Sequence, residues 1–101
     1  MPRFVLVATV AEIPAGTGKA VKADGRPIAV FNIGGTFHAI DGTCPHQGGP
    51  LGEGFLEGTV VSCPWHFWQF DVVKGHATDF PEASIPKYQV KIEGQDIYVE
   101  V

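Results

Sequence analysis

The stretch VKADGRPIAVFNIGGTFHAI, residues 21–40, decides the fold of this chain. Its apolar, β-branched runs are separated by the dipeptides Asp24-Gly25 and Gly34-Gly35. Both dipeptides are strong hairpin signals, because the two central positions of a tight type I′ turn need positive φ. No helical apolar period of useful length accompanies them. The stretch therefore predicts antiparallel strands at Val21–Ala23, Pro27–Ile33 and Thr36–Ile40.

Short β-rich runs continue on both sides of this stretch, and most of them end at glycine. We expect further strands at Phe4–Val10, Thr59–Ser62, Trp68–Val73, Tyr88–Ile92 and Ile97–Val101. Strands of this length and spacing are typical of a sandwich or barrel. The sequence thus predicts an all-β fold in which residues 1–101 form a single domain.

The composition excludes several classes of protein. Seven basic against 11 acidic residues give a net charge of −4, which argues against nucleic acid as a partner. Two cysteines in 101 residues exclude a disulfide-rich scaffold. No apolar run is long enough to span a bilayer, and the N-terminus lacks the features of an export signal. We therefore expect no membrane partner and a cytoplasmic location.

Two segments interrupt the strand pattern and are predicted to be loops. The first, at about 41–57, is rich in glycine and proline, and the second covers about 63–67. Each contains Cys-Pro followed by a histidine: Cys44-Pro45-His46 and Cys63-Pro64-Trp65-His66. Long ordered loops on a small domain usually carry function. Cys44, His46, Cys63 and His66 are therefore candidate metal ligands.

The spacing of these ligands favours a binuclear centre over a single ion. A mononuclear zinc finger usually pairs its cysteines on one hairpin and its histidines on one helix. Here each loop carries one cysteine and one histidine, and Cys-x-His closes awkwardly on one ion. A two-iron rhomb takes a thiolate on one iron and an imidazole on the other from each loop, as in two-cysteine, two-histidine [2Fe-2S] centres. A structural zinc site remains the alternative.

The segments CPHQGGPLGEG, residues 44–54, and CPWHFWQFD, residues 63–71, resemble the two cluster-binding boxes of Rieske ferredoxins. The likeness is strongest to the small ferredoxins that serve ring-hydroxylating dioxygenases. It implies a Rieske-like β fold with a cluster-binding subdomain made of the two loops, and one [2Fe-2S] cluster per chain. It also implies that Cys44 and Cys63 hold the inner iron, and His46 and His66 the outer iron.

The resemblance suggests further residues around the cluster. Gly48 and Gly49 are expected to let the backbone approach the cluster closely with positive φ, as in an anion-binding nest. Leu51, with Pro50, is expected to form an apolar lid, and Pro81 to cover a third side. Trp65 is predicted either to fill the core, the favoured interpretation, or to form a docking surface. Phe67 departs from the small residue usual in the family after the second histidine.

The same resemblance predicts a low reduction potential. Respiratory Rieske proteins have a serine and a tyrosine that donate hydrogen bonds to the cluster sulfurs. Trp68 and Phe70 occupy those positions here, and fewer donors stabilise the reduced cluster less.

The function implied is electron transfer rather than catalysis. We expect a carrier that takes one electron from a flavin reductase and delivers it to a terminal aromatic-ring-hydroxylating oxygenase. No arrangement of residues typical of bond-making catalysis stands out in the sequence. The alternatives are the Rieske small subunit of an assimilatory nitrite reductase and, from another class, a zinc-stabilised structural or interaction domain.

Overall fold

The computed structural model describes residues 3–43, 49–65, 68–78 and 84–101. Short 3₁₀ turns, η1 (Val10–Glu12) and η2 (Leu51–Glu53), accompany the strands. In the described residues the strands are β1 (Phe4–Thr9), β2 (Thr17–Ala23), β3 (Arg26–Ile33), β4 (Thr36–Asp41), β5 (Phe55–Glu57), β6 (Val60–Ser62), β7 (Gln69–Asp71), β8 (His76–Ala77), β9 (Lys87–Tyr88), β10 (Val90–Glu93) and β11 (Asp96–Glu100). The predicted all-β class is confirmed.

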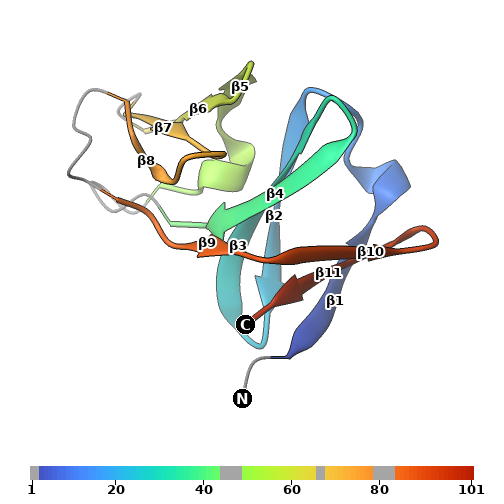
Figure 1. Cartoon of the computed structure of the whole chain (residues 1–101). Helices are drawn as coiled ribbons and strands as arrows, with labels where there is room; N and C mark the ends of the chain where they lie inside the picture. The colour runs from blue at the N-terminus through green and yellow to red at the C-terminus, as the bar shows by residue number, and fades with distance from the viewer. Residues whose placement is uncertain (1–2, 44–48, 66–67, 79–83) are drawn as a thin grey trace.

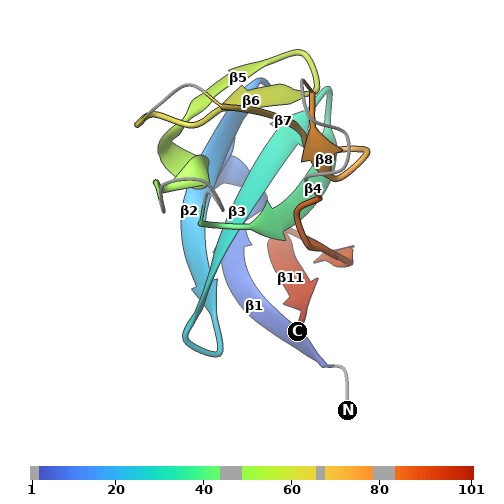
Figure 2. The same ribbon diagram turned by 90° about the vertical axis from the view of Figure 1, so that its left-hand side faces the viewer.

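The described strands form three antiparallel sheets, ordered β1-β11-β10, β2-β3-β4-β9 and β5-β6-β7-β8. We call the first two sheets the basal region. The third sheet, with the described residues 42–43, 49–54, 63–65 and 68, is called the loop region. Figures 1 and 2 show that the loop region lies at one end of the molecule, while β1, β10 and β11 lie at the other.

Strand β3 is the shared centre of the fold, because both of its faces are buried. Ile28 and Val30 belong to the core of the basal region, with Ile13, Ile97 and Val99 among its other members. Ala29 and Phe31 alternate with them and belong to a second core, which includes Leu51 and Cys63. A strand covered on both faces is expected to be a continuous apolar run, and IAVF at 28–31 is one.

The loop region is an excursion that starts and ends on paired residues of the basal region. Strand β4 leads into it and β9 leads out, and Ile40 pairs with Lys87 where the two strands meet. The Asp41 amide also donates to the Pro86 carbonyl at 2.9 Å. The Lys87 ammonium then donates to the Val73 carbonyl and so connects β9 to the turn between β7 and β8.

The strand prediction was wrong at several places. The strand expected at Tyr88–Ile92 is divided between β9 and β10, which belong to different sheets, and the one expected at Trp68–Val73 is only Gln69–Asp71. Strand β2 begins at Thr17, four residues before the predicted start. Strand β5 occupies Phe55–Glu57, where the sequence predicted loop. Strand β8 has only two residues and is too short to leave a pattern. The glycine-rich composition that indicated a loop is concentrated before Phe55, and Gly58 makes a positive-φ turn that pairs β5 with β6.

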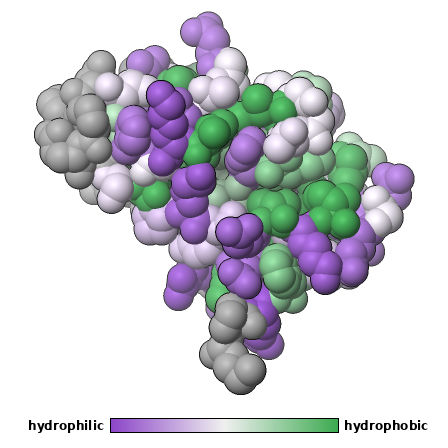
Figure 3. All heavy atoms as spheres, in the orientation of Figure 1, coloured by the Kyte–Doolittle hydropathy of each residue, from purple (hydrophilic) through white to green (hydrophobic). Residues whose placement is uncertain are grey.

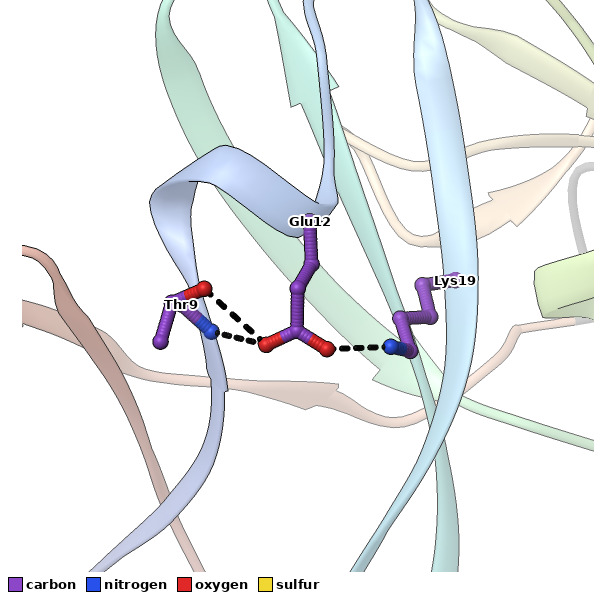
Figure 4. A network of polar contacts seen from close by, with 3 residues as sticks. All are labelled: Thr9, Glu12 and Lys19. Atoms are coloured by element: carbon purple, nitrogen blue, oxygen red, sulfur yellow. Dashed lines mark hydrogen bonds and ion pairs between the residues drawn. The ribbon is translucent and has the colours of Figure 1, made fainter.

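A polar network fixes the N-terminal turn, as Figure 4 shows. Glu12 accepts hydrogen bonds from the Lys19 ammonium and from the amide and hydroxyl of Thr9. The bonds from Lys19 and then Thr9 lower the pKa of Glu12 to about 2. The network therefore favours the ionised carboxylate and joins β1, η1 and β2.

The outer surface of the basal region mixes apolar and polar side chains. Phe4, Leu6 and Ile92 are exposed on the sheet β1-β11-β10, and Figure 3 shows apolar and hydrophilic side chains interspersed on this side. The Lys91 ammonium lies 5.3 Å from the centroid of the Phe4 ring. Among the described residues, no helix is long and apolar enough to cross a membrane.

Candidate metal centre

Backbone hydrogen bonds close the base of each predicted cluster loop. The Leu51 amide donates to the Gly42 carbonyl at 2.9 Å, and Thr43 forms a bridge with Pro50. In the second loop the Cys63 amide donates to the Trp68 carbonyl at 2.8 Å. Each loop therefore begins and ends at a fixed position on the scaffold.

Cys63 directly follows β6 and is fully buried. It is a free thiol, and it belongs to the core that contains Phe31, Leu51 and Phe70. A buried cysteine beside a Gly-Pro-rich loop is either an inert core residue or a metal ligand. The residues around the sulfur of Cys63 distinguish between these two roles.

Gly49 brings the first loop against that sulfur. A Cβ placed on Gly49 would lie 2.7 Å from Cys63 Sγ, closer than real Cβ atoms approach other heavy atoms. Gly49 is also buried. Glycine is therefore needed here for space, while its expected positive φ and its approach to a cluster stay predictions.

Trp65 lies on the outside of this contact. Its Cγ and Cδ2 atoms are 3.1 and 3.2 Å from the position of a Gly49 Cβ, yet 57% of the residue is exposed. The favoured interpretation that Trp65 fills the core is therefore wrong. Trp68 instead packs against the core, with its ring centroid 6.4 Å from that of Phe70.

Leu51 is fully buried in the same core as Cys63 and supports it from within. Pro50 is half-buried and pairs with Thr43, and the lid expected from Leu51 and Pro50 stays a prediction. The remaining residues singled out by the sequence lie outside the described residues: Cys44, His46, Gly48, His66, Phe67 and Pro81. The structure thus brings together Cys63, Gly49, Leu51 and Trp65, and it leaves the complete ligand set as a prediction.

Sequence reasoning missed the role of three further glycines in the first loop. A Cβ on Gly42, Gly52 or Gly54 would lie within 2.8 Å of backbone atoms of Ile28, Ala20 or Ser62. None of the three has positive φ. Glycines in this loop therefore allow the chain to lie directly on β2, β3 and β6. Their clustering in the sequence is the available signal, but it indicates only a loop and not the contacts that require glycine.

Asp71 fixes the turn that follows the second loop. Its Oδ1 accepts hydrogen bonds from the amides of Val73 at 2.9 Å and Lys74 at 3.0 Å. Burial works to raise the pKa of Asp71, but the hydrogen bonds from Lys74 and Val73 outweigh it, so this pKa is lowered. The ionised carboxylate therefore stabilises the turn beside β7.

The described residues fit a centre that needs soft ligands. Cys63 supplies a buried sulfur donor with no disulfide partner. Its sulfur lies against Gly49 of the first loop, where no Cβ fits. A thiolate held inside protein at the junction of two loops is the donor expected for an iron–sulfur cluster.

Comparison with known proteins agrees with this site. The profile of the Rieske [2Fe-2S] domain matches residues 3–89. The ferredoxin component of a naphthalene 1,2-dioxygenase system from Pseudomonas aeruginosa is 37% identical over 91 residues, which cover 89% of this chain and 88% of that protein.

Solved structures extend the comparison. A chain of the complex of reduced oxygenase and oxidized ferredoxin in carbazole 1,9a-dioxygenase is 31% identical, with a TM-score of 0.85 over 95% of this chain and 91% of that chain. A putative NADH-dependent nitrite reductase small subunit from Mycobacterium tuberculosis has a TM-score of 0.90 over 100% of this chain and 96% of that one. Its identity is 22%, so this likeness concerns the fold alone.

Proposed function

The chain belongs to the Rieske [2Fe-2S] domain family, and we propose that it carries single electrons from a flavin reductase to a terminal aromatic-ring-hydroxylating oxygenase. Its relatives include ferredoxin components of dioxygenase systems, which are electron carriers rather than catalytic enzymes. The observation that carries the proposal is Cys63, a buried free thiol in the second Rieske box that lies against Gly49 of the first. The cytoplasmic location stays a prediction.

The proposed ligands are Cys44 and Cys63 for one iron, and His46 and His66 for the other. When bound, the [2Fe-2S] group accepts and releases one electron. Cys63 would supply its thiolate from the buried end of the site, because it lies in the core with Leu51 and Phe70. The basal region contributes no predicted ligand. It supports the two loops but does not itself bind the metal.

Iron and acid-labile sulfide in the purified protein test the centre directly. We expect two irons and two sulfides per chain, and an electron paramagnetic resonance spectrum of the reduced protein that shows mixed nitrogen and sulfur ligation. Cys63→Ser should remove most of the cluster, whereas Cys63 would be dispensable in a merely packed core. Zinc without sulfide would overturn the proposal and favour the structural zinc domain.

The potential is proposed to be low, because the side chains at positions 68 and 70 have no hydroxyl. Phe70 is fully buried and belongs to the core that contains Cys63. Phe70→Tyr adds a hydroxyl donor in that core and should raise the reduction potential. Phe31→Tyr, in the same core but on β3, is the matched control. An unchanged potential in Phe70→Tyr would contradict this account.

The partners are tested by reconstitution. Ferredoxin-dependent product formation is measured with a flavin reductase and a terminal oxygenase from a dioxygenase system. The same assay with the large subunit of an assimilatory nitrite reductase tests the alternative. Turnover with the flavin reductase and the oxygenase, but not with the nitrite reductase, supports the proposal. Turnover only with the nitrite reductase would contradict it.

A further inference from the structure

Contact between the two cluster loops passes through a glycine and an exposed aromatic ring. Gly49 of the first loop is buried, and Trp65 of the second loop lies over it. A Cβ on Gly49 would meet both Cys63 Sγ and the Trp65 ring. One backbone position therefore lies close to both the sulfur and the indole.

The exposure of Trp65 has no explanation in the packing of the core. Tryptophan has one of the largest apolar side chains, and leaving the residue 57% exposed forgoes much of the stabilisation that burial would give. The described hydrogen bonds hold each loop at its own base, Gly42 to Leu51 and Cys63 to Trp68. These bonds do not join one loop to the other.

We propose that Gly49 and Trp65 form a clamp, in which the indole presses the first loop onto the second and keeps water away from the sulfur of Cys63. Gly49 provides the space, and Trp65 covers it. In this arrangement Trp65 is a positioning residue, since it acts on the ligand through Gly49. This inference rests on the proposed function, because Cys63 is taken as a cluster ligand.

The clamp has two measurable consequences in the native holoprotein. Without the indole the loops separate more easily, so a chelator should remove iron faster. Water also gains access to the sulfur, and solvent stabilises the extra negative charge of the reduced centre, so the potential should rise. A residue that only contributes to packing would change the rate of iron loss through the stability of the whole protein, and it would leave the reduction potential unchanged.

Trp65→Ala and Trp65→Phe separate the ring from the rest of the protein. Trp65→Ala should increase the rate of iron loss to a chelator by about tenfold, the effect of a lost aromatic contact, and raise the potential. Trp65→Phe keeps a ring over Gly49 and should stay within about twofold of the wild-type rate. Phe4→Ala, which removes another exposed aromatic ring from the distant sheet β1-β11-β10, is the matched control and should change neither quantity.

Gly49→Ala tests the other half of the clamp. The added methyl would lie 2.7 Å from Cys63 Sγ, so the iron content of the purified variant should fall below half of the wild-type value. In the double variant Gly49→Ala/Trp65→Ala the added methyl no longer meets the ring. Its rate of iron loss should therefore increase by less than the product of the factors measured for the two single variants. Independent, multiplicative effects would contradict a shared contact.

The outcomes keep the clamp and the proposed function apart. Wild-type iron release and potential in Trp65→Ala, or equal effects in Phe4→Ala, would overturn the clamp while leaving the electron carrier in place. A wild-type protein without iron and sulfide would overturn the carrier. In that case alkylation of Cys63 by iodoacetamide, located by peptide mass mapping, decides the clamp: Trp65→Ala should speed it by about tenfold, and an unchanged rate would refute it.

Discussion

The basal region and the loop region are built on the same strand but are held together differently. The basal region has strands of up to eight residues, regular hairpins and a core made of aliphatic side chains. The loop region has strands of two or three residues, and its core includes a cysteine. Four glycines in its first segment allow the backbone to lie directly on its neighbours.

This difference teaches where each region obtains its stability. Burial of Ile28, Val30 and Ile97 gives the basal region its own core without any predicted ligand. The core of the loop region is not smaller, but Ala29, Phe31 and Ile40 in it come from the basal sheet β2-β3-β4-β9. Within the described residues the loop region has no core of its own, so a bound metal centre is expected to supply part of its stability. The boundary runs through β3, whose alternate residues face the two cores.

The largest expected effect comes from removing the iron. Amides of β5–β8 should then exchange with solvent at least about a hundredfold faster, because the loops that flank them lose their common anchor. Amides of β1, β10 and β11 should change by less than about threefold. Hydrogen exchange with and without iron measures both. Equal loss of protection in the two regions would show that the distinction between them is false.

Core truncations should sharpen the comparison. Ile28→Ala in the basal core and Leu51→Ala in the loop-region core each remove a fully buried side chain. Each should lower the free energy of unfolding by about 2–5 kcal/mol. Only Leu51→Ala should also accelerate iron loss under native conditions. Denaturant titration and chelator kinetics measure the two quantities, and faster iron loss in Ile28→Ala would contradict the separation.

Lys87 connects the two regions and is expected to have a smaller effect. Its ammonium donates to the Val73 carbonyl, while its methylenes pack on Gly75. Lys87→Met keeps the methylenes and should cost about 1 kcal/mol or less, because the bond is exposed. Proteolysis of the β7–β8 turn should become faster. Lys91→Met, which breaks an ion pair within the basal region, should leave that turn unchanged.

The smallest expected effect concerns how the free energy of unfolding of the basal region depends on pH under acidic conditions. The pKa of Glu12, lowered to about 2 from 4.5, means that its contribution is present above about pH 4.5 and is lost as the pH falls through 2. Glu12→Gln should flatten the dependence of unfolding free energy on pH in this window. The iron content should not change. A wild-type slope in Glu12→Gln would show that the network of Figure 4 does not stabilise the turn.

Sequence patterns predicted the basal region well because its signals are local. Asp24 and Gly25 have the positive φ that the type I′ turn requires, and so do Gly34 and Gly35. In the loop region the signals are contacts between residues distant in sequence. Trp65 is exposed and lies over Gly49, 16 positions earlier, and no periodicity reports such a contact.

The packing role of the glycines could not be predicted for the same reason. A cluster of glycines in sequence indicates a loop, yet Gly52 and Gly54 are required by the backbone of Ala20 and the Ser62 carbonyl, which belong to other elements. The ligand motif could be found because its chemistry depends on residue type and spacing. The space around Cys63 could not, because it depends on where the two loops meet.

The pairing of Ile40 with Lys87 makes the excursion from Asp41 to Pro86 a cassette in the engineering sense. Its two ends lie side by side on adjacent strands, so a short hairpin connection would close the remaining sheet without moving β4 or β9. Such a shortened protein would expose Ala29, Phe31 and Ile40 on one face and would need polar replacements there. Conversely, a foreign sheet could host the cassette if it offers two neighbouring strand ends and a complementary apolar face.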